Sequence, residues 1–385
     1  SFKISNESSP FPEILGRICP QDKLCEGACT LNEDGYGAIT IGSIETAITE
    51  RGFEAGFELD FPGVTSDKKV AVIGSGPAGF SAANFLLRAG IKVVMFEKDS
   101  VAGGLLTWGI PGFKLEKEVV QKRFEILKKA GLDLRLNCEI GKDISFESIK
   151  KDYDAVFIGV GASRSNSLGL KNENTSNVVN AIDFLRDVQS KLFKFKEATL
   201  NDIKGKSVLV IGGGDTAMDC VRTSLREGAR SVKCIYRRDE ANMPGSKKEF
   251  INANEEGVEF IFLASPKAIN VKNEKATSVT FVKMLLAEKD SSGRQKTIEV
   301  DGSEFDVEAD LIIMSLGFSH QEKEFLKGSG IKLDKWGGFE VGSNCETSLN
   351  LVYAGGDCIR GADLAVTAAR DGRVAAFNII NRLLK

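Results

Sequence analysis

Residues 70–79 read VAVIGSGPAG, an apolar run that leads directly into a G-x-G-x-x-G sequence. A continuous apolar strand of this kind is typical of a parallel sheet that is covered on both faces. Gly74 permits the tight turn, Gly76 lets a pyrophosphate approach the backbone, and Gly79 allows strand and helix to pack closely. A helix over 78–88 and a strand over 92–96 follow. The stretch therefore predicts a βαβ dinucleotide-binding unit.

The end of the second strand carries an acid, Glu97. A carboxylate at this place can accept hydrogen bonds from ribose hydroxyls. The helix that begins near Pro77 and Ala78 faces the phosphates with free N–H groups and the positive end of its dipole. Because the adenosine ribose of FAD has a free 2′-hydroxyl, this acid-tipped unit suits FAD.

A second unit of the same kind occurs at residues 207–217, which read SVLVIGGGDTA, followed by a helix over 216–226 and a strand over 231–236. This strand ends in Arg237 and Arg238 instead of an acid. Arginine binds a 2′-phosphate through charge-assisted, often bidentate bonds, whereas the alternative is a solvated surface pair. We expect NADPH rather than NADH here, bound by Gly212, Gly214, Asp215, Thr216, Ala217, Arg237 and Arg238.

The C-terminal region completes the expected flavin site. An apolar strand over 351–354 leads into the sequence AGGD at 354–357, and a long helix over 364–384 follows. Asp357 can bond a ribityl chain while the next helix aims its N-terminus at the flavin; the alternative is an Asp that only caps the helix. The expected FAD contacts are Gly74, Gly76, Pro77, Ala78, Gly79, Glu97, Gly104, Leu105, Gly317, Gly356, Asp357, Leu364 and Thr367.

These motifs predict an α/β protein with two Rossmann-like nucleotide-binding domains, the NADPH domain being inserted in the FAD domain. The expected boundaries are 66–175 and 313–385 for the FAD domain and 176–312 for the NADPH domain. A further buried strand is predicted over 309–316, and hairpin turns at 272–275 and 288–295. Residues 1–65 are predicted to be an irregular iron–sulfur segment whose one helix runs from 41 to about 57.

Cys19, Cys25 and Cys29 lie close together in that first segment, and the other five cysteines are scattered. Closely spaced thiolates are soft ligands that suit an iron–sulfur cluster or zinc, although three are one short of the usual four. The alternative is a set of buried or reactive cysteines. Cys220 and Cys234 read as core packing. The chain has no C-x-x-C, which disfavours a redox disulfide of the thioredoxin reductase type.

Composition excludes several other classes of protein. The chain has a single histidine, His320. This disfavours a Ser-His-Asp triad and excludes a multi-histidine metal site within the chain. A net charge of −3 disfavours nucleic-acid binding. No apolar run approaches the ~20 residues that cross a bilayer, so we expect a cytoplasmic protein. Hydride transfer between cofactors needs no side-chain acid or base, and we therefore expect no catalytic residue in the usual sense.

Several blocks of the sequence resemble the small (beta) subunits of bacterial NADPH-dependent glutamate synthases, and the likeness runs from about residue 11 to residue 384. The resemblance implies a flavoprotein that takes hydride from NADPH onto FAD. It would then pass electrons through [4Fe-4S] clusters to a large subunit, which makes glutamate from glutamine and 2-oxoglutarate. The blocks are GRICPQDKLCEGACTL at 16–31, GGLLTWGIP at 103–111, GGDTAMDCVRT at 213–223, YRRDE at 236–240, NMPGS at 242–246, AGGD at 354–357 and RGADL at 360–364.

The resemblance also implies a fourth cluster ligand. In the related dihydropyrimidine dehydrogenases a polar side chain sixteen residues after the third cysteine completes the site, and here that position is Glu45. The alternative is a Glu45 that is only a solvated helix residue. Members of the family carry a further cysteine-rich helical block before this segment, and we expect this chain to start after it.

Two other functions stay open at this point. The same electron-input module could serve a ferredoxin–NADP transhydrogenase or a dihydropyrimidine dehydrogenase. A non-catalytic binding subunit is disfavoured because both glycine loops are intact.

Overall fold

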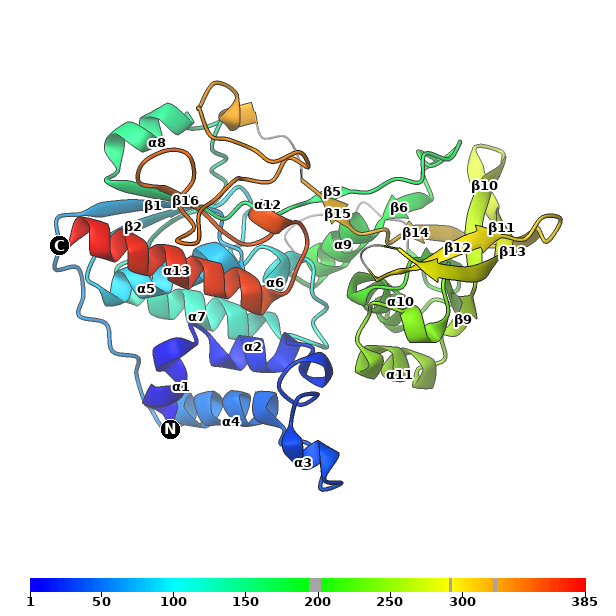
Figure 1. The fold of residues 1–385 in the computed structure, drawn as a ribbon, viewed down its shortest axis with the longest axis horizontal. Coiled ribbons are helices and arrows are strands. Elements are labelled where there is room, and N and C mark those ends of the chain that lie inside the picture. Colours follow the sequence, from blue (N-terminus) through cyan, green and yellow to red (C-terminus); the bar gives the residue numbers. More distant parts are fainter. Residues whose placement is uncertain (194–201, 291–292, 321–323) are drawn as a thin grey trace. The chain divides into compact units, whose positions relative to one another are not determined.

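The computed structural model describes residues 1–193, 202–290, 293–320 and 324–385 (Figure 1). The chain divides into two compact units: unit 1 comprises residues 1–164 and 318–385, and unit 2 comprises residues 165–317. Unit 2 is thus inserted in unit 1, and the chain enters and leaves it through two short paired strands, β5 (Arg164–Ser165) and β15 (Phe318–Ser319). The predicted α/β class, with one domain inserted in another, is confirmed.

Unit 1 is built on a parallel sheet with the strand order β16-β4-β1-β2-β3. Val70 and Val72 of β1 pack into the core on one face, while Ala71 and Ile73 pack into the core on the other. Burial on both faces explains the uninterrupted apolar run. The strands are β1 (Lys69–Ile73), β2 (Lys92–Phe96), β3 (Asp133–Arg135), β4 (Ala155–Ile158) and β16 (Val352–Ala354).

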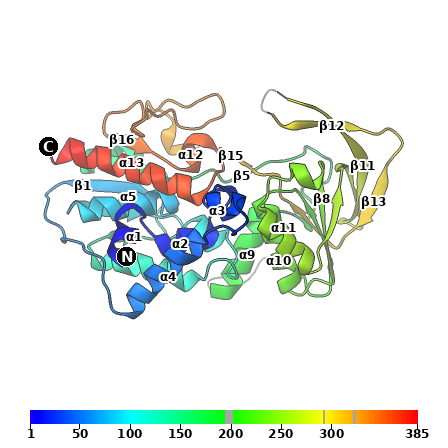
Figure 2. The same ribbon diagram turned by 60° about the horizontal axis from the view of Figure 1, so that its bottom comes forward.

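Helices cover both faces of this sheet. One face carries α5 (Pro77–Arg88), α7 (Lys117–Lys129) and α13 (Ala365–Leu383), and the other carries α8 (Phe146–Asp152). Figure 2 shows α13 lying along α5. The two helices are in backbone contact, since a Cβ added at Gly372 would lie 2.1 Å from the Ala78 carbonyl oxygen. The short elements α6 (Leu105–Trp108), η3 (Glu324–Leu326) and α12 (Asp357–Arg360) complete unit 1.

The helix predicted from 41 to about 57 is present at 41–54, and the first 57 residues contain more helix than the sequence indicated. The reason is tertiary: Phe11, Ile14 and Leu15 are buried in the core of unit 1, and Phe2 packs edge-on against Phe53 at 5.3 Å. Helices of seven residues show little periodicity and depend on such packing. The helices are α1 (Phe2–Ser8), α2 (Pro12–Ile18), η1 (Gln21–Lys23), α3 (Thr30–Glu33) and α4 (Ile41–Glu54).

Unit 2 contains a second parallel sheet with the order β6-β14-β7-β8-β9. Its strands are β6 (Val178–Asn180), β7 (Ser207–Ile211), β8 (Ser231–Tyr236), β9 (Glu259–Phe262) and β14 (Leu311–Met314). Helices α9 (Ala181–Phe193), α10 (Asp215–Arg226) and α11 (Lys247–Glu255) pack on it, together with the short η2 (Glu240–Asn242).

An antiparallel sheet, not foreseen in its extent, accompanies the parallel sheet of unit 2. It consists of β10 (Ala264–Lys272), β11 (Lys275–Lys289), β12 (Gln295–Glu299) and β13 (Phe305–Glu308). The hairpin turn predicted at 272–275 is confirmed between β10 and β11; β11 also pairs antiparallel with β12, but residues 291–292 of the turn predicted at 288–295 lie outside the described residues. The strand predicted over 309–316 is the shorter β14.

Candidate functional site

The first glycine loop joins β1 to α5. Two of its glycines, Gly74 and Gly79, pack closely against backbone, whereas Gly76 has open space beside it. Gly74 has a φ of +94°, and a Cβ on it would lie 2.5 Å from the Gly159 carbonyl oxygen. A Cβ on Gly79 would lie 2.0 Å from the Gly74 carbonyl oxygen. Gly76 differs, because its φ of −62° suits any residue and no heavy atom lies within 4 Å of the place of its Cβ. This open place, at the N-terminus of the helix that starts with Pro77 and Ala78, fits a pyrophosphate.

Glu97 is buried and binds the glycine loop itself. Its Oε2 accepts hydrogen bonds from the backbone N–H of Ser75 (2.9 Å) and from the Ser75 hydroxyl (2.5 Å), and its Oε1 accepts one from the N–H of Asp99 (2.9 Å). A carboxylate has about four acceptor positions, so one remains for a ribose hydroxyl. The role of Glu97 at FAD stays a prediction, and its part in holding the turn is an addition to it.

Gly104 and Leu105 lie against this loop. The N–H of Gly103 donates to the Ser75 hydroxyl (2.9 Å), and a Cβ on Gly104 would lie 2.8 Å from the Cα of Gly76. Leu105 begins α6 and is 39% exposed. The stretch predicted to line the flavin is therefore adjacent to the predicted phosphate cradle.

The C-terminal turn is held by a carboxylate that the sequence analysis missed. Asp371 is 2% exposed and accepts a hydrogen bond from the N–H of Gly356 (2.8 Å) and a bidentate pair from Arg360 (2.5 and 2.8 Å). A Cβ on Gly356 would lie 3.0 Å from the Cβ of Ala78, so this turn rests on the first turn of α5. Arg360 and Asp371 are eleven residues apart on different helices, and no local sequence motif marks such a pair.

Asp357 follows that turn and is largely buried. Burial, together with Asp363 and Asp371 nearby, raises the pKa of the Asp357 carboxyl to about 7. Its side chain accepts the N–H of Asp363 at 3.3 Å and does not cap α12, whose N-terminal cap is Gly356. A buried carboxyl with spare acceptor positions fits a ligand hydroxyl.

Of the other predicted FAD residues, Leu364 is the N-terminal cap of α13 and the Thr367 hydroxyl donates to Asp363 (2.8 Å), whereas Gly317 is the last residue of unit 2.

The second glycine loop, between β7 and α10, repeats the design of the first. A Cβ on Gly212 would lie 2.1 Å from the Ser315 carbonyl oxygen, whereas nothing lies within 4 Å of the place of a Cβ on Gly214, whose φ is −89°. Thr216 and Ala217 follow in the first turn of α10. The Oδ1 of Asp215 accepts a hydrogen bond from the N–H of Ser246 at 2.7 Å, and the role of Asp215 at NADPH stays a prediction. The segment at 242–246 is thereby tied to the loop.

The structure separates the two arginines at the tip of β8. Arg237 is exposed. Arg238 is 9% exposed, and its guanidinium donates to the Gln295 carbonyl oxygen of β12 (2.6 Å) and to the Tyr236 hydroxyl (3.2 Å). Arg237 is thus available to a 2′-phosphate, while Arg238 joins the tip of β8 to the antiparallel sheet.

Arg237→Ala is expected to raise the KM for NADPH about tenfold or more and to leave the KM for NADH nearly unchanged, because only NADPH carries the phosphate. Arg238→Ala is expected to raise both constants by similar factors and to lower the melting temperature, because it removes a buried donor from two acceptors. Steady-state kinetics with both nucleotides and thermal unfolding of both variants measure this. Equal effects of Arg237→Ala on the two nucleotides would contradict the assignment.

The cysteine segment lies in unit 1, at the end of α2. Burial raises the pKa of the Cys19 thiol to about 12, with added effects of the nearby Glu45 carboxylate and of Cys25. Burial also raises the pKa of Glu45. The Cys29 thiol is partly buried, and hydrogen bonds from the backbone, first of all at Ile39, lower its pKa. Cys19, Cys25 and Glu45 are therefore close enough to interact, which places the predicted fourth ligand beside the cysteines.

The donor chemistry of these residues fits an iron–sulfur cluster, since thiolates are its usual ligands. Within residues 1–193, 202–290, 293–320 and 324–385, however, no three Cys, His, Asp or Glu side chains are gathered around one metal position. The ligand set Cys19, Cys25, Cys29 and Glu45 therefore stays a prediction. Cys220 and Cys234 are buried in the core of unit 2, as the sequence predicts.

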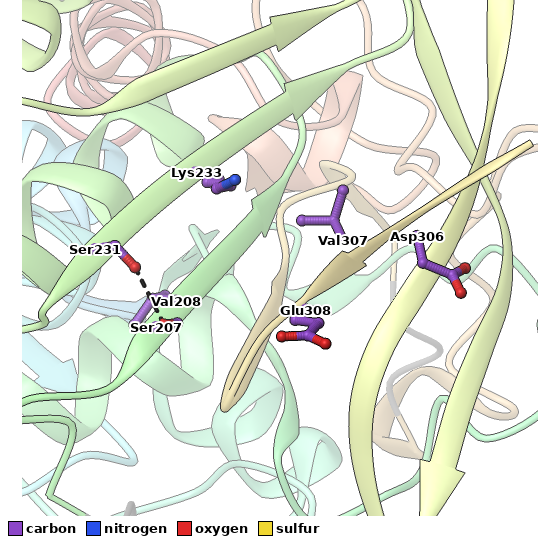
Figure 3. A pocket seen from close by; sticks show the side chains of 7 residues that line it. All are labelled: Ser207, Val208, Ser231, Lys233, Asp306, Val307 and Glu308. Atoms are coloured by element: carbon purple, nitrogen blue, oxygen red, sulfur yellow. Dashed lines mark hydrogen bonds between the residues drawn. The ribbon is translucent and has the colours of Figure 1, made fainter.

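A cavity of about 400 Å³ lies in unit 2 (Figure 3). Ser207 and Ser231, whose hydroxyls are 3.1 Å apart, stand at the starts of β7 and β8, whereas the glycine loop follows the end of β7. The cavity is therefore distinct from the predicted NADPH site. The residues lining the cavity are Ser207, Val208, Ser231, Lys233, Asp306, Val307 and Glu308.

Among the described helices, none has the length and apolarity needed to traverse a membrane.

Comparison with known proteins gives two family matches. Residues 68–372 match the pyridine nucleotide-disulphide oxidoreductase family, and residues 1–57 match the family described as dihydropyrimidine dehydrogenase domain II, 4Fe-4S cluster. The small chain of the NADPH glutamate synthase of Escherichia coli is 47% identical over 99% of this chain and 82% of its own length.

Two further similarities bear on function and fold. The putative oxidoreductase AegA of Escherichia coli is 46% identical over 100% of this chain, which spans 59% of the length of that protein. The solved structure of Mycobacterium tuberculosis FprA in complex with NADPH has a TM-score of 0.69 at 21% identity, covering 83% of this chain and 85% of its own. The latter likeness concerns the fold alone.

Proposed function

The chain belongs to the glutamate synthase small chains, within the pyridine nucleotide-disulphide oxidoreductase family, and on this basis we propose that it oxidises NADPH and passes the electrons to a glutamate synthase large subunit in the cytoplasm. It is an NADPH-dependent oxidoreductase of a family that uses FAD and a 4Fe-4S cluster. In this proposal FAD occupies the first glycine loop and NADPH the second.

The observation that carries the proposal is that the cysteine segment and the acid-tipped glycine loop share one hydrophobic core. Phe11, next to α2, stacks on Phe80 of α5 at 4.8 Å, and Phe80 stacks on Phe124 of α7 at 4.0 Å. All three rings are fully buried. A fixed placement of the thiols relative to the flavin loop is what transfer between two centres requires.

Each group of residues has one task in this scheme. FAD accepts two electrons as hydride and releases them singly, and a cluster accepts them one at a time. Gly76 leaves room for the phosphates of FAD and Gly214 for those of NADPH. Arg237 selects the 2′-phosphate of NADPH, and the Asp357 carboxylate accepts a hydrogen bond from a hydroxyl of the FAD chain. None of these side chains donates or abstracts a proton in the hydride step.

Co-purification with the large subunit tests the proposal. We expect a yellow-brown complex in which NADPH oxidation under argon depends on glutamine and 2-oxoglutarate. NADPH oxidation that the large subunit and glutamine leave unchanged would refute it.

The similarity to AegA favours one second candidate, the same module serving another acceptor. Here the isolated protein would reduce its flavin with NADPH but would not bind a glutamate synthase large subunit. The complex formation experiment above separates the two candidates, and a transhydrogenase or a dihydropyrimidine dehydrogenase partner would be found in the same way.

Glu45→Ala is expected to lower the iron and sulfide content of the protein by at least about half, because it removes one predicted ligand from the cluster. Iron and sulfide assays on anaerobically purified protein measure this, and Glu54→Ala, an exposed glutamate on the same helix, provides the comparison. A Glu45→Ala protein with a full cluster would show that another group is the fourth ligand.

A further inference from the structure

The end of α2 that carries Cys19 is fastened by a single arginine, Arg17, two residues earlier. Its guanidinium donates to the Glu13 carbonyl oxygen of the same helix (2.9 Å), to the Glu50 carboxylate of α4, and to the Glu116 carboxylate just before α7 (3.0 Å). The Arg17 side chain is 16% exposed. One mostly buried cation therefore joins α2, α4 and the start of α7.

The residue after Glu116, Lys117, extends this joint of α2, α4 and α7 to the stretch around α6. Lys117 is 5% exposed, and its ammonium group donates to the Leu106 carbonyl oxygen of α6 (2.9 Å) and to the Ile110 carbonyl oxygen. These acceptors bracket the stretch 106–110, at the C-terminal end of α6, where a cation also favours the helix dipole. Glu116 and Lys117 are adjacent in the chain, so any shift of one is transmitted to the other.

The residues that lie against the first glycine loop, Gly103 and Gly104, come just before the stretch that Lys117 holds, and Gly104 accepts the N–H of Trp108 in α6 at 2.9 Å. Gly103 donates to Ser75, and Gly104 approaches the backbone of Gly76, as described above. A continuous path of contacts thus runs from the glycine loop through α6, Lys117, Glu116 and Arg17 to Cys19. The aromatic stack at Phe80 docks the start of α2, whereas this path determines where its cysteine end lies.

We propose that Arg17 and Glu116 are positioning residues for electron exit: they set the place of the cysteine segment relative to the loop beside the flavin. This rests on the proposed function. The joint links the cysteine segment to the first glycine loop, so it affects transfer from the flavin to the cluster more than transfer from NADPH to the flavin. Neither residue contacts the nucleotide loops directly.

The test uses Arg17→Gln, Glu116→Gln and the control Glu125→Gln in the full chain with both cofactors. Glu125 is a suitable control because it also lies on α7, pairs with Lys128 at 2.8 Å, and has the same 61% exposure as Glu116. Anaerobic mixing with NADPH is followed by flavin absorbance for the first transfer and by EPR of freeze-quenched samples for cluster reduction.

We expect cluster reduction to slow more than flavin reduction in Arg17→Gln and Glu116→Gln, and both rates to be unchanged in Glu125→Gln. Cluster reduction is expected to slow roughly tenfold in Arg17→Gln, the order of effect of a displacement below 1 Å. A smaller loss of about threefold is expected in Glu116→Gln, because a partly exposed pair contributes little by itself. An equal slowing of both transfers, or the same slowing in Glu125→Gln, would overturn the proposal.

Amide hydrogen exchange provides a readout that needs no cluster. In Arg17→Gln and Glu116→Gln the exchange of residues 17–29 and 103–110 is expected to rise together, because the path connects them. Unchanged exchange at 103–110 in Arg17→Gln would overturn the joint. If the unsubstituted protein holds flavin and no cluster, the proposed function fails, while the exchange experiment still decides whether the joint exists.

Discussion

Gly76→Val is expected to give a folded protein that carries no FAD. The backbone of Gly76 suits valine, and among the described residues, apart from its chain neighbours, no heavy atom lies within 4 Å of the new Cβ, so the side chain is compatible with the fold. The branched side chain instead fills the place where a pyrophosphate approaches the backbone. We expect FAD affinity to fall at least ~100-fold, which corresponds to about 2.7 kcal/mol. Flavin absorbance of the purified protein and its titration with FAD measure this.

The control for this prediction is the unsubstituted protein stripped of FAD. Because a ligand stabilises the state that binds it, loss of FAD alone lowers stability by a few kcal/mol. Gly76→Val should therefore melt at the temperature of the stripped protein, and not below it. A variant that purifies with a full complement of FAD would show that the first loop does not hold that cofactor.

Gly214→Val is expected to produce the opposite pattern, a yellow protein that NADPH reduces poorly. The same two conditions hold here, a permissive φ of −89° and empty space around the place of the Cβ. FAD content should be normal, whereas the NADPH concentration needed for half-maximal flavin reduction should rise ~100-fold, again about 2.7 kcal/mol. Anaerobic bleaching of the flavin by NADPH measures this.

Chemical reduction by dithionite separates the two sites. We expect dithionite to bleach the flavin of Gly214→Val as it does in the unsubstituted protein, since the second loop is needed only for the nucleotide. Loss of FAD from Gly214→Val, or an unchanged response to NADPH, would contradict the division of cofactors between the two loops.

The glycine loops could be predicted because each is a local feature. A strand, a turn that needs small residues and a helix start follow one another within about ten residues. The residue types of the turn are enough to indicate what it binds. The bounds of β1, β2, β7 and β8 follow the predicted strands closely for the same reason. The seven-residue helices α1 and α2 escaped prediction because packing against distant residues, and not local periodicity, stabilises them: Phe2 of α1 packs on Phe53, and Phe11, next to α2, stacks on Phe80.

The two arginines of β8 show where reasoning from residue type stops. Both carry the same charge and stand side by side, so the sequence predicts the same role for both. Both follow the end of β8, but Arg237 is exposed, whereas Arg238 is buried and meets the Gln295 carbonyl oxygen of a strand more than fifty residues away. Likewise Glu97 was predicted from its place at the end of β2, but its bonds to Ser75 depend on how the loop folds back.

By itself the sequence determined the class of fold, the two dinucleotide loops, the preference for NADPH and the cysteine segment, because each depends on residue types at short spacing. Only the tertiary structure decided which arginine is exposed, which carboxylates hold the turns, and how Cys19 is joined to the stretch beside the first glycine loop. Those features are contacts between segments far apart in the chain, such as Arg17 with Glu116 and Gly356 with Asp371. Such contacts form only when the core brings the segments together, and no short stretch of sequence contains both partners.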